Sequence, residues 1–258
     1  MPRKCAFCPQ DAVELGGEHV WDNWLNKALP KLHYRTLKIY SLDSPPIVGE
    51  ADSLNAKFPV VCVDCNNGWM SVLSLKVKER FSRAMLDGEP FSLGPRDAAI
   101  LAAFTFMKAV VTNYVESDYE PFFTRAAREN FRTSLTLPPM LKQWFAAFRG
   151  KARMSTRTNF GIGSTSEPSP LYGMEFGSFT YVVGKLALQL LAPRWKDVRD
   201  RGRPLLSLIP NAHWHRAAIL FWPCAGGFLS WPPAEYIGDN MIQAFIERFG
   251  NQVNVPIP

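Results

Sequence analysis

The chain has 258 residues, of which 47% are hydrophobic and 20% are charged. This composition is typical of a chain that folds around an apolar core, and it excludes disorder over the whole length. The longest apolar stretch, residues 98–111, contains Lys108 and is too short for a membrane span. The first residues run from Pro2 straight to Cys5 without the apolar segment of a secretion signal. We therefore expect a soluble, cytoplasmic protein without a membrane partner.

Four of the five cysteines form two Cys-x-x-Cys pairs, Cys5 with Cys8 and Cys62 with Cys65. Each pair places two thiolates on one tight turn, and two such turns together complete the four-coordinate shell of zinc. Disulfides are an alternative that a reducing compartment disfavours, and a redox motif needs only one pair. The spacing therefore predicts a structural Zn²⁺ bound by these four residues. Cys224 lies in the apolar run 221–225 and is predicted to be a buried small hydrophobe.

Three polar residues flank these cysteine pairs. Glu18 and His19 follow the first pair, and Asn66 comes directly after the second. Hydrolysis of a phosphodiester needs a divalent cation at the phosphate and a base for the attacking water. Glu18 and Asn66 offer the oxygen ligands that a hard cation prefers, and His19 can accept a proton near neutral pH. Two other interpretations are an ordinary histidine at position 19 and a helix-capping role for Asn66, which Asn67 could also fill.

The order Cys5-x-x-Cys8, Glu18-His19, Cys62-x-x-Cys65-Asn66 resembles the HNH nucleases with a four-cysteine zinc, also called ββα-metal or His-Me finger nucleases. It is most similar to the endonuclease VII branch. The resemblance covers residues 1–80 and implies a β-hairpin and a helix held by zinc. It implies that Glu18 and Asn66 hold a catalytic Mg²⁺ or Mn²⁺ and that His19 is the general base. Glu18 stands where the family often has Asp, and Lys57 where many members have an asparagine.

Helical spacing of apolar residues continues after the second cysteine pair. The stripe that predicts the first helix consists of Met70, Leu73, Val77, Phe81 and Met85. We expect a turn-rich boundary over residues 88–95. Further helices are predicted over residues 95–115, 121–131 and 139–148, the last one ended by Gly150.

The rest of the chain shows a mixed pattern. Residues 151–162 and 216–222 are predicted strands. Residues 179–191 favour a buried helix, although 180–183 also fit a strand entering it. Residues 194–203 are expected to form an exposed loop and 234–249 a helix. The predicted fold class is therefore α+β, with a zinc-stapled ββα-metal module at residues 1–88 and a larger mixed α/β domain at 89–258.

Basic residues are concentrated in the segment 125–157, which has eight Lys and Arg against the single acid Glu129. We expect this segment to contact phosphates, with a solvated helix face as the equal alternative. The predicted nucleic-acid contacts are Arg125, Arg128, Arg132, Arg149, Lys151 and Arg153.

The sequence as a whole predicts a metal-dependent endonuclease acting on DNA, with RNA as another substrate left open. The alternative is an inactive, zinc-stapled protein that binds nucleic acid or another protein. The larger domain could select the target, sense a signal or form a homodimer, and the sequence does not decide among these roles.

Overall fold

The computed structural model describes the chain in thirteen segments. They are residues 4–10, 18–19, 22–29, 34–41, 44–51, 57–58, 60–116, 121–151, 154–162, 172–195, 209–210, 214–249 and 253–254.

The chain divides into two compact units. The cysteine unit comprises residues 1–80 and 106–137, and the sheet unit comprises 81–105 and 138–258. Both units are discontinuous in sequence and thus differ from the predicted modules 1–88 and 89–258. The functional division at residue 88 stays a prediction.

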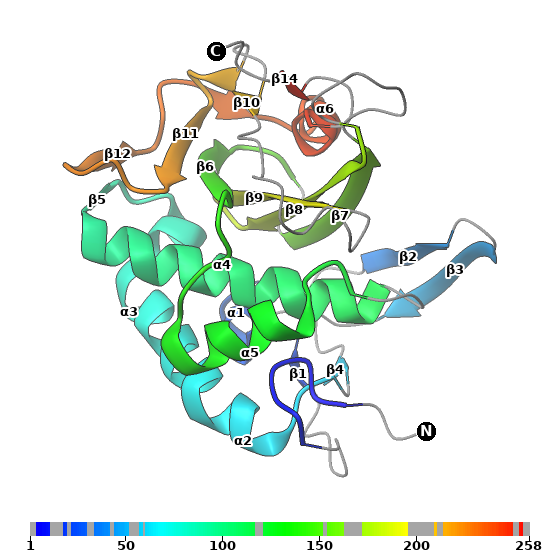
Figure 1. Ribbon diagram of the computed structural model, residues 1–258. Coiled ribbons are helices and arrows are strands. Elements are labelled where there is room, and N and C mark those ends of the chain that lie inside the picture. Colours follow the sequence, from blue (N-terminus) through cyan, green and yellow to red (C-terminus); the bar gives the residue numbers. More distant parts are fainter. Residues whose placement is uncertain are drawn as a thin grey trace. The chain divides into compact units, whose positions relative to one another are not determined.

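The cysteine unit contains two pairs of antiparallel strands. Strand β1 (Glu18–His19) pairs with β4 (Lys57–Phe58), with Glu18 opposite Phe58 (Figure 1). Strands β2 (Tyr34–Ser41) and β3 (Ser44–Ala51) form the second pair. The short helix α1 (Asn23–Ala28) follows β1.

A helical run begins at the second cysteine pair. Cys62 has the extended backbone of an N-cap residue, with φ −76° and ψ 160°, and it precedes α2 (Val63–Cys65). The turn η1 (Asn66–Met70) follows, with a kink at Gly68 where φ is −89° and ψ is −115°, and helix α3 (Ser71–Asp87) comes after it. Asn66 has helical backbone angles, so it lies inside the run and does not cap it. The predicted stripe from Met70 to Met85 is confirmed, because all five of its apolar side chains are buried.

Two further helices contribute to the cysteine unit. The helix predicted over 95–115 is confirmed as α4 (Pro95–Glu116), in which every residue from 101 to 113 is buried. Helix α5 (Arg125–Ser134) starts four residues later than predicted, because the Thr124 side chain accepts a hydrogen bond from the Ala127 N–H and caps it. Among the described helices, none combines the length and the apolar character that a membrane crossing requires.

An antiparallel sheet dominates the sheet unit. Its strands lie in the order β11 (Ala218–Trp222), β6 (Lys142–Phe148), β9 (Leu186–Trp195), β8 (Met174–Val183) and β7 (Met154–Ile162). Strand β13 (Tyr236–Ile237) adds a parallel pairing to β6. Two small pairs, β5 (Phe91–Leu93) with β12 (Leu229–Trp231) and β10 (Ile209–Pro210) with β14 (Val253–Asn254), accompany the sheet.

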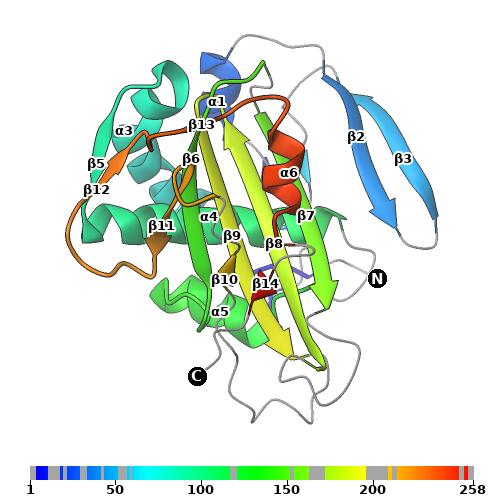
Figure 2. The ribbon, with the colours of Figure 1, turned by 90° about the horizontal axis from the view of Figure 1, so that it is seen from above.

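Both faces of this sheet are covered within the sheet unit. Figure 2 shows helix α6 (Ile242–Glu247) lying over one face, where Phe245 and Phe249 join an apolar cluster with Trp144. On the opposite face, the Gln143 side chain donates a 3.0 Å hydrogen bond to the Ala102 carbonyl of α4. Strands covered on both sides have continuous apolar sequences without alternation.

This double burial explains two wrong predictions. The helix predicted over 139–148 is strand β6, and the helix predicted over 179–191 is the hairpin of β8 and β9. The alternative of a strand over 180–183 is confirmed, because these residues form the end of β8. A continuous apolar run of this length has no periodicity that separates a buried strand from a buried helix. The hairpin turn depends on Gly184, whose φ of +55° is left-handed.

Of the other predictions for this part of the chain, some are confirmed and others are wrong. The strands predicted over 151–162 and 216–222 are confirmed as β7 and β11, each starting two or three residues later. The helix predicted over 234–249 is shortened to α6, with β13 before it, and the predicted turn region 88–95 contains β5. The predicted loop 194–203 lies outside the described residues beyond position 195. Cys224 is half-buried, so the prediction of a fully buried residue is wrong.

Candidate metal centre

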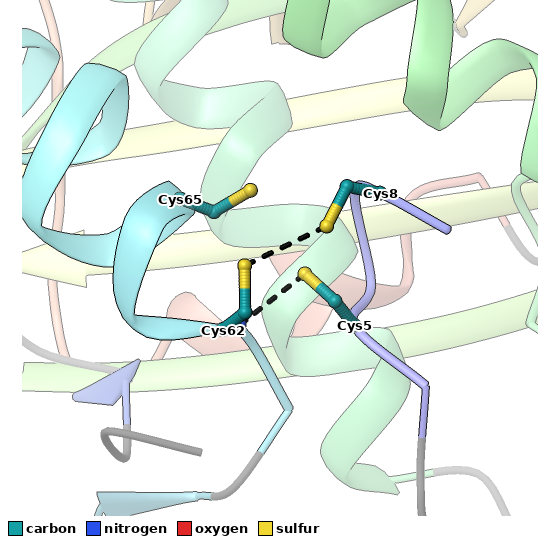
Figure 3. Close-up of side chains that lie close together, drawn as sticks. All are labelled: Cys5, Cys8, Cys62 and Cys65. Carbon is teal, nitrogen blue, oxygen red and sulfur yellow. Dashed lines mark hydrogen bonds between the residues drawn. The ribbon is translucent and has the colours of Figure 1, made fainter. Parts of the chain in front are cut away.

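The four paired cysteines converge in the cysteine unit. All four side chains are buried, and their sulfur atoms all lie within 4.8 Å of one another. Figure 3 shows Cys5 and Cys8 on one loop facing Cys62, which directly precedes α2, and Cys65, the last residue of α2. The Cys8 and Cys62 sulfurs are 3.5 Å apart. These four residues lie close enough together to bind a metal ion. No other group of three or more such ligands occurs in the described segments.

Backbone hydrogen bonds hold the two loops side by side. The Ala6 N–H donates to the Val60 carbonyl at 2.8 Å, which fixes the first loop against the residues that lead into Cys62. The Cys5 sulfur accepts hydrogen bonds from the N–H of Cys62 at 3.3 Å and of Phe7 at 3.5 Å. Backbone donors aimed at a sulfur favour its thiolate form, which is the form that binds metals.

The cluster shifts the pKa of its own thiols in opposite directions. The pKa of Cys5 is lowered to about 4, chiefly by a hydrogen bond from Cys65. Burial raises the pKa of Cys8 to about 11. The pKa of Cys65 is raised because its thiol shares a hydrogen bond with Cys5 and because it is buried. The hydrogen bond between these two residues therefore favours the thiolate of Cys5 and the neutral thiol of Cys65.

Helix α5 places two arginines beside the cluster. Arg128 is 6% exposed, and it donates hydrogen bonds to the carbonyls of Phe123, at 3.0 Å, and of Ala6. For Arg132, burial lowers the pKa, but a hydrogen bond to Cys65 and the charge of the cluster raise it more, so the net shift is upward. The expected phosphate contact by Arg128 is thus replaced by a structural role, because its guanidinium is buried against the first loop.

An aromatic cluster packs around the same place. Phe7, between the first two cysteines, makes edge-on contact with Trp69, with ring centroids 5.0 Å apart. Trp69 and Phe131 of α5 are in similar contact at 5.5 Å. The cysteine cluster therefore lies in the core of its unit, and a metal ion bound there would connect elements that are distant in sequence.

The predicted catalytic residues are described to different extents. The backbone of Glu18 and His19 forms β1, while their side chains lie outside the described part of the structure. Asn66 is half-buried at the start of η1, and its N–H donates to the Cys62 carbonyl at 3.0 Å. The second cysteine pair thus fixes the backbone of Asn66 directly.

The remaining predicted nucleic-acid contacts lie in both units. In the cysteine unit, Arg125 is exposed and pairs with Glu129 at 2.7 Å. In the sheet unit, Arg149 is exposed with its guanidinium 3.4 Å from the Tyr236 ring centroid, and Lys151 is exposed. Arg153 lies outside the described residues.

Sequence reasoning missed a buried polar group in the cysteine unit. The Lys108 ammonium lies 2.9 Å from the Asp22 carboxylate, and the two side chains are 1% and 8% exposed. The one signal for this pair was the position of Lys108, the single charge within the apolar stretch 98–111.

Comparisons with known proteins do not add to this picture. No protein-family model, no curated protein and no solved structure matches the chain.

Proposed function

We propose that this protein is a metal-dependent endonuclease that acts on DNA and whose N-terminal module is stapled by structural zinc. The observation that carries the proposal is the convergence of the four buried cysteines on either side of the Glu18-His19 segment. The HNH-like arrangement requires such a convergence. The zinc-stapled alternative requires it as well, but it gives no catalytic role to Glu18 and His19.

Zinc is the metal that these four residues suit best. Zn–S bonds of about 2.3 Å in a tetrahedron place the sulfurs about 3.8 Å apart. The 3.5 Å separation of Cys8 and Cys62 and the 4.8 Å limit for the group bracket this spacing. Four thiolates leave no position for substrate, so such an ion is structural and the hydrolytic chemistry needs a second site.

The backbone around the cluster supports a second site on β1 and η1. Strand β1, carrying Glu18 and His19, pairs with β4 four residues before Cys62, and the helical run with Asn66 follows. Helix α1 and the pair of β2 and β3 are inserted between β1 and β4 along the chain. The pairing of β1 with β4 ahead of a helix is compatible with the strands and helix that the resemblance implies. We assign Glu18 and Asn66 as oxygen ligands of Mg²⁺ or Mn²⁺, which supplies positive charge for the phosphate when bound. His19 accepts the proton of the attacking water.

Exposed basic side chains are available to contact the phosphates of a DNA substrate. Arg125 in the cysteine unit and Arg149 and Lys151 in the sheet unit have exposed side chains, whereas the buried Arg128 is not proposed as a phosphate contact. Contacts between such cations and phosphates release counterions, so DNA affinity should fall steeply as salt concentration rises.

Cleavage of supercoiled plasmid with Mg²⁺ or Mn²⁺ tests the proposal. We expect the parent protein to nick DNA and His19→Ala to be about 10²- to 10⁴-fold slower, because the general base is lost. The matched control is His215→Ala, which removes an exposed histidine of the sheet unit and should leave the rate unchanged. Metal content, measured by mass spectrometry, should be one zinc per chain in all three proteins.

The outcomes separate the nuclease from its alternative. Equal rates for the parent and His19→Ala would contradict the assigned base. Salt-sensitive DNA binding without cleavage of plasmid, single-stranded DNA or RNA would contradict the nuclease and favour the zinc-stapled binding protein.

A further inference from the structure

A buried ion pair connects three helices of the cysteine unit. Asp22 directly precedes α1, and its Oδ1 lies 2.9 Å from the Lys108 Nζ on α4. The Ser74 hydroxyl on α3 donates a 3.0 Å hydrogen bond to the same carboxylate oxygen. One carboxylate therefore holds α1, α3 and α4 together at a single point.

Stability alone is a weak reason for this arrangement. Removing two charges from water costs more free energy than the pairing usually returns, and apolar side chains of similar size are often at least as stable. The second carboxylate oxygen of Asp22 is buried and has no hydrogen-bond partner among the described residues, which adds to the cost. The ion pair instead provides precise positioning, because charge-assisted hydrogen bonds fix the positions of their partners more narrowly than apolar contacts do.

The positions that the pair fixes are those of the two halves of the proposed active site. Asp22 comes three residues after His19, at the end of the segment that begins with β1. Ser74 comes eight residues after Asn66, on helix α3, which follows the kink at Gly68. The contacts of Asp22 with Ser74 and Lys108 therefore fix two points of the chain, one three residues from His19 and one eight residues from Asn66.

We propose that Asp22 and Lys108 are positioning residues that hold the Glu18-His19 segment in register with Asn66. This inference rests on the proposed function for its catalytic consequence, but the anchoring itself does not. A displacement of about 1 Å at reacting groups can cost about 10²-fold in rate. The pair should therefore affect kcat, while substrate binding and zinc binding remain as they are.

The test uses the double variant Asp22→Asn with Lys108→Met in the full chain. Removing both charges avoids a lone buried charge, so the variant should fold and keep its zinc. We expect hydrogen exchange of residues 18–29 to be at least about tenfold faster, and kcat for DNA cleavage to fall about 10²-fold with KM within about twofold. The matched control is Arg216→Met with Glu235→Gln, which removes an exposed ion pair of 2.9 Å and should change neither readout.

Each outcome decides between the two proposals. Unchanged exchange and unchanged kcat in the double variant would overturn the positioning role. Faster exchange with unchanged kcat would overturn it as well, because the anchor would then be structural only. If the parent protein cleaves no nucleic acid, the proposed function fails, and faster exchange of residues 18–29 still supports the anchor while normal exchange overturns it.

A second variant covers a failure of the double variant to fold. Ser74→Ala removes only the hydroxyl that connects Asp22 to α3 and leaves the ion pair in place. Loss of one such hydrogen bond should accelerate exchange of residues 18–29 about fivefold. No acceleration in this variant would overturn the proposal.

Discussion

The two units bury a basic side chain in different ways. In the cysteine unit, Lys108 faces the Asp22 carboxylate at 2.9 Å. In the sheet unit, Arg248 donates to the neutral Gln189 amide at 2.5 Å, and its guanidinium lies 4.6–5.0 Å from the ring centroids of Phe249, Phe245 and Trp144. Burial lowers the pKa of Arg248 to about 9. A carboxylate partner fixes a position, whereas ring faces and an amide tolerate a charge within an apolar core.

The two units also differ in the interactions that stabilise them. The sheet unit is held by an antiparallel ladder and by an apolar cluster that includes Trp144, Phe148 and Phe245. The core of the cysteine unit contains four buried thiols that lie close enough together to bind a metal ion. The stability of the sheet unit should therefore not depend on a metal ion, whereas the stability of the cysteine unit should depend on one.

Removal of one ligand should have the largest effect on this contrast. In Cys62→Ser we expect loss of the metal and fast hydrogen exchange in residues 60–70 and 125–134, with β6, β8 and β9 still protected. Structural zinc sites contribute about 10–16 kcal/mol in small domains, so the loss should exceed any single packing change. Exchange mass spectrometry and metal analysis measure both effects. The control is Cys224→Ser, outside the cluster, and a Cys62→Ser protein that kept full metal content would contradict the prediction.

A change in the hairpin of β8 and β9 should affect the sheet unit by a smaller amount. Gly184 has a φ of +55°, and a Cβ there would overlap the Met85 carbonyl oxygen. We expect Gly184→Ala to lower the free energy of unfolding by about 2–4 kcal/mol in urea titrations, with unchanged metal content. The control is Gly227→Ala, with a φ of +78° and no atom near the added methyl, which should cost only about 1–2 kcal/mol. Equal losses in both variants would show that the overlap contributes nothing.

The sequence predicted those elements whose signals are local. The stripe of α3 repeats every three or four residues, and each Cys-x-x-Cys pair is a complete turn, so helix and cluster were both predictable. Strand β6 and the hairpin of β8 and β9 were not, because coverage of both faces removed the alternation that identifies a strand. Burial by distant segments thus determined which elements could be predicted.

Contacts between distant segments also limited what could be predicted around the candidate site. Asp22, Ser74 and Lys108 meet through three elements far apart in sequence, and no local pattern connects them. Arg128 belongs to a basic segment, but charge density does not reveal that its guanidinium is buried against the Ala6 carbonyl. Sequence reasoning therefore found the groups that could do chemistry and missed the groups that hold them in place.

The smallest of the expected effects concerns the charge beside the cluster. Zn²⁺ with four thiolates carries a net charge of about −2, and Arg132 lies close enough to Cys65 for its pKa to be raised. Arg132→Met should weaken zinc binding about tenfold in competition with a chelator, as the loss of groups that contact metal ligands commonly does. Lys78→Met, which removes an exposed charge from α3, should change zinc affinity less than twofold. If both variants weakened zinc binding equally, the overall charge of the unit, and not the contact with Cys65, would account for the effect. Normal zinc affinity in Arg132→Lys would show that a positive charge at position 132 is sufficient.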